Sequence, residues 1–329
     1  MKIVRSKVKK NALLVALVFA SLRNNLTEGK MCTAKNSESN SFLNGFVFDS
    51  SKVDDILSCV LKCSQNELCA SINMNILSMK CELSKSTKRK HPQNSVYQPQ
   101  MIYMEIRDPP GFTADNPIPS CKWIKNLDNQ AKSGVYWMKF NEPSSASFQV
   151  FCDMTTDGGG WTLVYSYTFT QYSKFTSASN AVTPAPYWPV NWLSSSYWVP
   201  RSMTTPLSES SRSAMGFALW KKIGNEFLLK PNITNWVSCV EGTGSLVNWV
   251  SGSLTCRVVK AITSTCTNVA AEYIRVSNSG LCLQLNGKFY VCLEGSIRSV
   301  WPVHDPCGTS NAGNHLQNIP NPGGALYIR

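Results

Sequence analysis

Thirteen cysteines constrain this chain of 329 residues more than any other feature. They are spread along the sequence, and no two have the C-x-x-C spacing that is typical of zinc sites. Cysteines in this number are typical of proteins that fold in an oxidising compartment, where disulfides brace small domains. The pattern therefore predicts an exported, disulfide-braced protein.

Residues 1–22 have the features of a secretory signal peptide. The first ten positions are rich in Lys and Arg, and an apolar run follows at 12–22. That run is shorter than the roughly 20 apolar residues that a spanning helix needs, although an uncleaved signal anchor is the alternative. We expect a secreted, extracellular protein with no membrane span, in which a polar lead-in at 23–31 follows the signal.

The composition is that of a folded protein, with 43% hydrophobic and 16% charged residues. The formal net charge of +12 falls to about +7 when the five cationic side chains of the signal are removed. A basic run at 85–91 predicts a solvated loop or, alternatively, a patch that attracts acidic polysaccharide. No nucleic-acid recognition motif is present, so nucleic acid is not an expected partner.

Two N-x-S/T sequons, at Asn25 and Asn232, are candidate glycosylation sites. Both suit an exported chain.

The segment 49–75 predicts a capped helix. Cys59 and Cys63 are four residues apart, so they share one helical face and both reach the same neighbouring strand or loop. The acids at positions 54 and 55 suit the positive end of a helix dipole better than acid–base chemistry. Expected cap residues are Asp49, Ser50 or Ser51, and the apolar residues at helical spacing are Val53, Ile56, Val60 and Leu61.

The segment 108–119 contains four prolines and a glycine and is predicted to be a linker between two units. Beyond it the chain reads as short strands, at 134–140, 145–154, 271–277, 288–294 and 324–329, with some helix near 211–224. The strongest strand prediction is 161–169, where aromatic and aliphatic residues alternate with mostly polar ones.

Three consecutive glycines at 158–160 could belong to a phosphate-binding loop or to a turn. Phosphate loops lead into a helix, whereas a strand follows here, and neither known glycine-rich phosphate motif is present. The pair Asp157-Gly158 instead favours a hairpin turn, in which glycine adopts a positive φ without strain.

Residues 120–165, which contain "SCKWIKNL", "SGVYWMKF" and "FQVFCDMTTDGGGWTLV", resemble the opening of fibrinogen C-terminal-like domains such as those of ficolins, tenascins and intelectins. The resemblance implies an α+β domain at 120–329 and a disulfide between Cys121 and Cys152. It also implies a platform for lectin or protein recognition, which in some members uses calcium. The calcium loop of the Asp-x-Asp type is absent here, so we expect no cofactor.

Residues 32–107 resemble a PAN/apple module. That resemblance implies the disulfides Cys59–Cys81 and Cys63–Cys69. It leaves Cys32 as the odd cysteine of thirteen, available for a covalent dimer. The combination of modules behind a signal peptide is similar to secreted cnidarian proteins, including proteins of the skeletal organic matrix of stony corals.

The sequence favours binding over catalysis. It has only three histidines and lacks metalloprotease and nucleophile-elbow motifs, so no enzyme activity is expected. Aromatic and polar residues late in the chain could border a sugar pocket, or could be core and loop residues; the aromatic-rich stretch 187–198 has the same two interpretations. The candidate ligand residues are Trp301, His304, Asp305 and His315.

The last six cysteines are expected to be bridged, but six cysteines allow fifteen pairings and the sequence assigns none. They are Cys239, Cys256, Cys266, Cys282, Cys292 and Cys307.

The predicted function is that of a secreted, non-enzymatic adhesion or extracellular-matrix protein, in a calcified skeletal matrix by resemblance, that binds glycan or protein partners. The alternative is an innate-defence lectin that recognises glycans.

Overall fold

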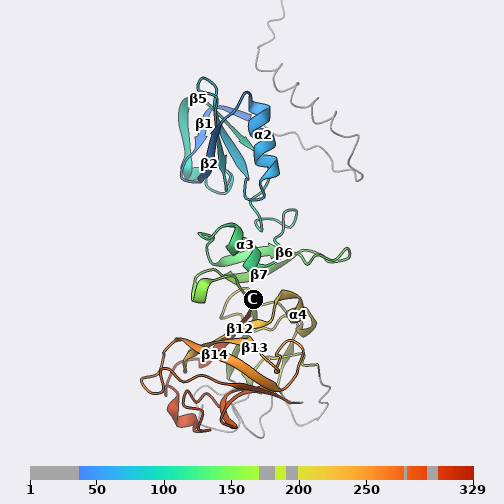
Figure 1. Ribbon diagram of the computed structural model, residues 1–329, viewed down its shortest axis with the longest axis vertical. Coiled ribbons are helices and arrows are strands. Elements are labelled where there is room, and N and C mark those ends of the chain that lie inside the picture. Colours follow the sequence, from blue (N-terminus) through green and yellow to red (C-terminus); the bar gives the residue numbers. More distant parts are fainter. Residues whose placement is uncertain (1–36, 170–181, 190–198, 278–279, 295–302) are drawn as a thin grey trace, which may run out of the picture. The chain divides into compact units, whose positions relative to one another are not determined.

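The computed structural model describes residues 37–169, 182–189, 199–277, 280–294 and 303–329 (Figure 1). The predicted signal peptide, the lead-in, Cys32, Asn25, Trp301 and positions 190–198 of the aromatic-rich stretch lie outside the described residues. The chain divides into two compact units, Met1–Asn116 and Pro117–Arg329. Strands dominate both units and the helices are few and short, which is compatible with the coarse α+β expectation.

The N-terminal unit is a five-stranded antiparallel sheet with one helix, α2 (Ile56–Gln65), packed on it (Figure 1). The strand order is β1-β5-β3-β4-β2. The strands are β1 (Ser37–Leu43), β2 (Val47–Lys52), β3 (Ser71–Asn75), β4 (Lys80–Ser84) and β5 (Ser95–Glu105), and a short 3₁₀ helix spans Pro92–Asn94.

Helix α2 begins later than the sequence predicts. Its N-cap is Asp55, whose carboxylate accepts a hydrogen bond of 2.7 Å from the Ser58 backbone N–H. The predicted cap at 49–51 is wrong because those residues belong to β2 and pair with β4, so sheet pairing overrides their capping preference. Leu61 is exposed rather than buried.

Two disulfides hold α2 against its surroundings. Cys59 and Cys63 are fully buried and bond to Cys81 on β4 and to Cys69, as the PAN resemblance implies. The bonds close loops with sequence separations of 22 and 6 residues. Such staples stabilise a small unit that has little apolar surface to bury.

The basic run at 85–91 forms a loop, as the sequence favours, but the loop is only partly solvated. Lys88 is buried, its ammonium donates to the Glu38 carboxylate at 2.6 Å, and it lies 4.3 Å from the centre of the Tyr103 ring. The exposed Arg89 is paired with Asp108. Two of the cationic side chains of this run therefore form ion pairs within the unit.

The predicted linker at 108–119 is partly structured. The backbone carbonyl of Asp108 accepts from the Asn116 amide at 2.6 Å, and its carboxylate accepts from Thr113 at 3.1 Å. The boundary between the two units falls after Asn116, inside the predicted segment.

The C-terminal unit is built on an eleven-stranded sheet, of which ten strands follow the order β17-β16-β15-β14-β13-β12-β18-β8-β7-β6. Strand β18 inserts between β12 and β8, so the last described segment of the chain lies in the middle of the sheet. The strands are β6 (Gly134–Met138), β7 (Phe148–Asp153), β8 (Trp161–Phe169), β9 (Val182–Thr183), β12 (Glu226–Pro231), β13 (Trp236–Glu241), β14 (Gly252–Lys260), β15 (Tyr273–Val276), β16 (Gly280–Leu285), β17 (Lys288–Glu294) and β18 (Gly323–Ile328).

Short elements complete this unit. A small parallel pair joins β10 (Ala185–Pro186) to β11 (Arg201–Ser202). The helices are α3 (Cys121–Leu127), α4 (Trp220–Ile223) and the 3₁₀ turns Thr156–Gly158, Phe217–Leu219 and Ala312–Asn314.

Strand β8 is buried along its whole length. The alternation in the sequence predicts that the aromatic side chains of β8, together with Leu163, point to one face. The pairing of β8 with β18 instead shifts register between Leu326 and Tyr327, which breaks this face in two. Trp161 and Leu163 therefore belong to a small cluster, while the tyrosines further along β8 belong to the large core. A one-residue shift moves the following side chains to the other face of a strand.

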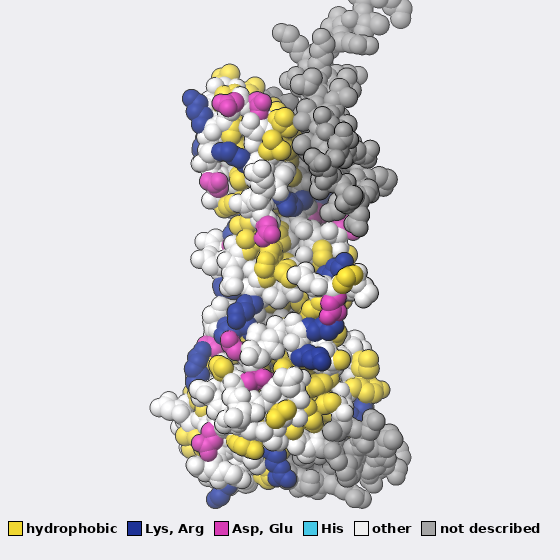
Figure 2. Space-filling model, turned by 45° about the vertical axis from the view of Figure 1, so that its right-hand side comes forward, with side chains coloured by type: hydrophobic (Ala, Val, Ile, Leu, Met, Phe, Trp, Pro, Cys, Tyr) yellow, Lys and Arg dark blue, Asp and Glu magenta, His cyan; other side chains and the backbone are white. Residues whose placement is uncertain are grey.

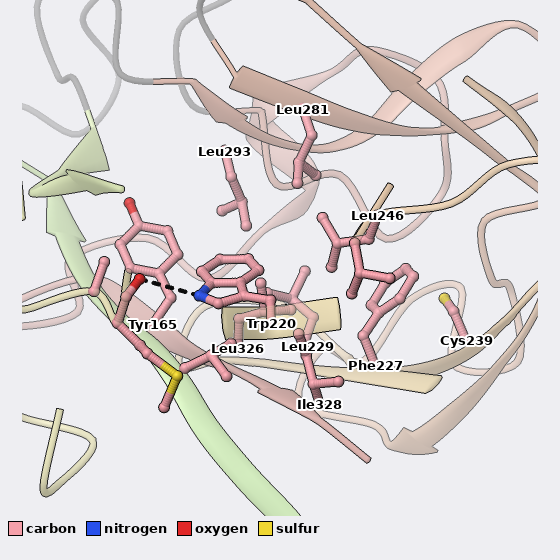
Figure 3. Close-up of a cluster of buried hydrophobic side chains, with 14 of the residues drawn as sticks. Tyr165, Trp220, Phe227, Leu229, Cys239, Leu246, Leu281, Leu293, Leu326 and Ile328 are labelled. Atoms are coloured by element: carbon pink, nitrogen blue, oxygen red, sulfur yellow. Dashed lines mark hydrogen bonds between the residues drawn. The ribbon is translucent and has the colours of Figure 1, made fainter. Parts of the chain in front are cut away.

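The large core gathers around Trp220 (Figure 3). Its indole N–H donates to the Met215 carbonyl at 3.1 Å, so this ring is fully buried without an unsatisfied donor. Tyr165, Phe227 and Leu281 are among the buried side chains of the same cluster, which joins strands distant in the sheet.

The three glycines shape a loop between β7 and β8 rather than a phosphate cradle. All three have positive φ, as the turn interpretation requires, and the loop that joins β7 to β8 spans 154–160. An added Cβ on Gly159 would lie 2.2 Å from the Met154 carbonyl oxygen. Arg329 fastens the loop by donating to the carbonyls of Asp157 and Gly159, each at 3.0 Å.

Four disulfides brace the C-terminal unit. Cys121 on α3 bonds to Cys152 on β7, as the fibrinogen-like resemblance implies. The six later cysteines, unassigned by the sequence, pair as Cys239–Cys256, Cys266–Cys307 and Cys282–Cys292. The first and last of these join residues that lie opposite each other on neighbouring antiparallel strands.

Candidate binding site

Strands β14, β15 and β16 form the floor of an open groove with a volume of about 890 Å³. Ser253, Tyr273 and Gln284 lie opposite one another on the three strands, so their side chains form a row across the sheet. Ile274 is fully buried on the other side of β15. Sites for small ligands typically have volumes of roughly 300–1,000 Å³, which places this groove in the usual range.

Three side chains present binding chemistry in the groove. Tyr273 exposes 39% of its surface, and Arg275, two residues further along β15, points to the same side of the sheet. Gln284 is only 9% exposed. An aromatic face, a cation and an amide therefore line one concave surface.

Backbone contacts at the edges hold the groove in shape. The Ser251 hydroxyl accepts from the Val276 backbone N–H at 3.0 Å, and the Glu272 carboxylate accepts from the Asn286 backbone N–H at 2.7 Å. At the other edge Gly252 approaches the preceding loop so closely that an added Cβ would lie 2.3 Å from a backbone nitrogen. These contacts fix the walls before a ligand arrives, which reduces the entropy cost of binding.

Of the two interpretations of the residues near the end of the sequence, burial favours core and loop residues for the three that the structure describes. His304 and Asp305 are fully buried and His315 is 3% exposed, so these side chains belong to the interior rather than to a ligand surface. The Tyr167 hydroxyl lies 3.2 Å from His304 Nε2, and the Phe169 ring packs edge-on against the imidazole. Burial, together with the charge of His315, lowers the pKa of His304 to about 3 and keeps the ring neutral.

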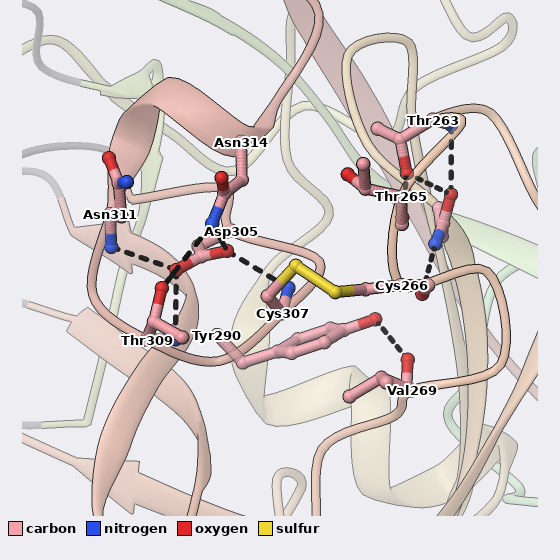
Figure 4. The surroundings of a disulfide bond; sticks show 11 residues. Thr263, Thr265, Cys266, Val269, Tyr290, Asp305, Cys307, Thr309, Asn311 and Asn314 are labelled. Atoms are coloured by element: carbon pink, nitrogen blue, oxygen red, sulfur yellow. Dashed lines mark hydrogen bonds between the residues drawn. A yellow bond between two sulfur atoms is a disulfide. The ribbon is translucent and has the colours of Figure 1, made fainter.

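Asp305 organises the loop that follows it (Figure 4). Its carboxylate accepts from the backbone N–H groups of Cys307, Thr309 and Asn311 at 2.8–2.9 Å. It also accepts from the Thr309 hydroxyl at 2.6 Å and the Asn314 amide at 2.8 Å. Burial alone would raise its pKa, but these hydrogen bonds outweigh it and lower that pKa.

The same loop is stapled by Cys266–Cys307, beside the ring of Tyr290, whose hydroxyl donates to the Val269 carbonyl at 2.9 Å (Figure 4). Both carboxylate oxygens of Asp305 thus accept hydrogen bonds within its own loop. Within the described ranges no group of three His, Cys, Asp or Glu side chains is arranged to hold a metal ion.

Asn232, the described sequon, follows β12 and is exposed. Its side-chain amide donates to the Asn321 carbonyl at 3.1 Å and its oxygen accepts from the Gly323 N–H at 2.9 Å. A glycosylated asparagine keeps one amide hydrogen, so both contacts are compatible with a glycan there.

The sequence predicted the strand that carries Tyr273 and Arg275 but did not single out either residue. The groove arises from three strands whose pairing the sequence does not reveal. One signal was available: Asn286-Gly287 joins β16 to β17 with both residues at positive φ, and Asn-Gly between apolar runs is a strong hairpin signal.

No helix in the part of the chain that the structure describes is long and apolar enough to cross a membrane.

Two family comparisons match parts of the chain. Residues 32–107 match the PAN domain family, and residues 97–196 match the family described as the fibrillar collagen C-terminal domain. The matches overlap at 97–107 and follow the same order as the two units. Together with the disulfides, they support an extracellular type of protein in which a PAN domain precedes a C-terminal domain similar to that of fibrillar collagens.

Proposed function

We propose that the protein is a secreted, non-enzymatic adhesion or extracellular-matrix protein that binds glycan or protein partners. The observation that carries the proposal is the preformed groove on β14–β16, set in a sheet that disulfides brace. The PAN match supports recognition of proteins or carbohydrates outside the cell. The resemblance of residues 120–165 to fibrinogen C-terminal-like domains supports the same class of function.

The proposed setting, a calcified skeletal matrix of a cnidarian, follows from the resemblance of the domain combination alone. Recovery of the native protein from demineralised skeleton tests it. Absence from that fraction, with presence in other extracellular material, would contradict the setting but leave the binding function intact.

An innate-defence lectin is the second candidate. The exposed Tyr273 ring favours it, because aromatic faces stack on the C–H surfaces of pyranose rings. A glycan array probed with the purified mature chain, with and without a chelator, discriminates the two. Selective binding that the chelator reverses favours a calcium-dependent lectin, whereas chelator-insensitive capture of matrix components favours adhesion.

A covalent dimer through Cys32 belongs to the same proposal. Non-reducing electrophoresis of the secreted protein would show a band of twice the monomer mass that Cys32→Ser abolishes. A secreted product that runs only as a monomer would remove this part of the proposal.

The proposal also includes the absence of enzyme activity. Profiling against broad hydrolase substrates tests this assignment, and measurable turnover would refute it.

A further inference from the structure

We infer that the groove on β14–β16 binds an acidic saccharide, in which a uronic acid carboxylate pairs with the Arg275 guanidinium while a pyranose ring stacks on Tyr273. This inference rests on the proposed function and names the ligand class of that same site. It depends on three properties of the groove: Arg275 favours a negative charge, whereas Tyr273 and Gln284 favour a saccharide. One carboxylate also lines the groove, that of Glu272, and it accepts a hydrogen bond from the Asn286 backbone N–H at 2.7 Å.

The first property is the charge of Arg275. This side chain lines the groove and is exposed, and within the described residues it makes no salt bridge. Arg257 and Arg329, by contrast, pair with Asp157 and Glu226. A guanidinium binds a carboxylate through two parallel hydrogen bonds, which gives both strength and orientation.

The second property is the position of Tyr273 beside that cation. Tyr273 lies opposite Ser253 and Gln284 on the flanking strands and exposes 39% of its surface. The ring is therefore accessible to a ligand that stacks on it. Because Tyr273 and Arg275 are two residues apart on one strand, they lie about 7 Å apart along the sheet, close to the size of one sugar ring.

The third property is the amide of Gln284. It is 9% exposed, lines the groove, and makes no side-chain hydrogen bond with any other described residue. An amide that both donates and accepts suits the hydroxyls of a saccharide, which also do both.

The distribution of charge between the units supports an anionic ligand at this site. Residues 117–329 contain sixteen Lys and Arg against ten Asp and Glu, whereas residues 37–116 contain eight against nine. Figure 2 shows Lys and Arg side chains spread over the visible face of the molecule, rather than gathered in one block. The C-terminal unit therefore attracts anions at long range, and Arg275 supplies a specific contact within the groove.

The test uses the full mature chain and a hyaluronan hexasaccharide, which alternates glucuronate with a neutral amino sugar. The matched ligand is the same hexasaccharide with its carboxyl groups reduced to alcohols. Calorimetry at low salt should show at least tenfold tighter binding of the acidic form, and this preference should weaken as sodium chloride is raised.

Variants assign the contacts. Arg275→Gln should reduce affinity for the acidic form at least tenfold and leave the neutral form unchanged, while Arg275→Lys should lose less. Tyr273→Ser should weaken both ligands, and Tyr273→Phe should retain most of the affinity. Lys221→Gln, which removes one exposed charge on α4 outside the groove, should change affinity less than twofold. Equal melting temperatures would show that each variant is folded.

Three outcomes would overturn the inference: no binding of the hexasaccharide, binding that Arg275→Gln does not weaken, or displacement of the hexasaccharide by an acidic peptide at lower concentration. If the chain still captures partners on the array or from matrix, the proposed function survives and only the ligand class fails. Failure of both assays would overturn the two proposals together.

Discussion

The ammonium of Lys230 donates to the carboxylate of Asp153 at 3.0 Å, with only 8% and 6% of the two side chains exposed. This pair ties β12 to the end of β7, where the glycine loop begins. Lys230 also contacts Glu209 at 2.7 Å and lies over the Trp236 ring at 4.6 Å. Burial alone would raise the pKa of Asp153, but hydrogen bonds from Thr156 and Thr155 and the charge of Lys230 outweigh it, so that pKa lies well below its usual range.

Replacing Lys230 by methionine should lower the free energy of unfolding of the C-terminal unit by about 3 kcal/mol, because it leaves a buried carboxylate without its cation. Chemical denaturation measures the change. The exposed Lys221→Met on α4 is the control and should stay within about 0.5 kcal/mol of the wild type. A Lys230→Met protein as stable as this control would contradict the structural role of the pair.

Gly159→Ala should be among the most damaging small substitutions in the chain. The residue has φ +75°, and a Cβ there would lie 2.2 Å from the Met154 carbonyl oxygen. Gly287 has a similar φ of +71° with nothing within 4 Å of its Cβ position, so Gly287→Ala measures conformational strain alone. We expect about 1 kcal/mol for Gly287→Ala and at least about 3 kcal/mol for Gly159→Ala. Equal losses of stability would show that the steric contact is absent.

Removing the Cys121–Cys152 disulfide should destabilise the C-terminal unit by about 3–4 kcal/mol, because the bond closes a long loop in the unfolded chain. The shorter Cys63–Cys69 loop should contribute only about 2 kcal/mol to the N-terminal unit. Paired Cys→Ser variants and denaturation of each unit measure both values. Peptide mapping that found the thiols of Cys121 and Cys152 unoxidised in the secreted protein would contradict the assignment.

Stability should fall as the pH drops below about 6.5, the usual pKa of histidine. The folded pKa of His304 is about 3, so the unfolded chain takes up the proton first and unfolding becomes more favourable. This contribution is fully present above pH 6.5 and is lost progressively as the pH falls toward 3. His315, whose pKa burial also lowers, adds to it in the same direction.

Between pH 7.5 and pH 5 the loss from His304 should be about 2 kcal/mol. Urea unfolding at the two pH values measures it, and His304→Gln should reduce the difference. Carboxylates such as Asp153 do not affect this comparison. The folded state lowers the pKa of Asp153, so the stability that its charge provides is lost only when the pH falls below about 4. A free energy of unfolding that is unchanged between pH 7.5 and pH 5 would refute the buried, neutral state of His304.

The sequence predicted local features better than pairings. The strand at 161–169 and the positive φ of the glycines were predictable because alternation and turn chemistry are local. Residues 49–51 were not, because their capping preference is weaker than the pairing of β2 with β4. The first three predicted disulfides came from family resemblance, whereas Cys266–Cys307 joins two loops that only the fold brings together.

The candidate site was the least predictable feature. His304 and Asp305 have side chains that can bind ligands, but both are fully buried in the interior. Tyr273 and Gln284 are eleven positions apart in an ordinary strand pattern, and their contact depends on the register between β15 and β16. Register is a tertiary property, so composition and spacing could not reveal the groove.

We propose that the groove on β14–β16 is the recognition surface of this protein. Hydrogen–deuterium exchange on the mature chain, with and without a partner obtained by affinity capture, tests it most directly. We expect slowed exchange at 272–276 and 284–287 when the partner binds, with little change around the Asp305 loop. Protection confined to other segments, while the partner is bound, would contradict it.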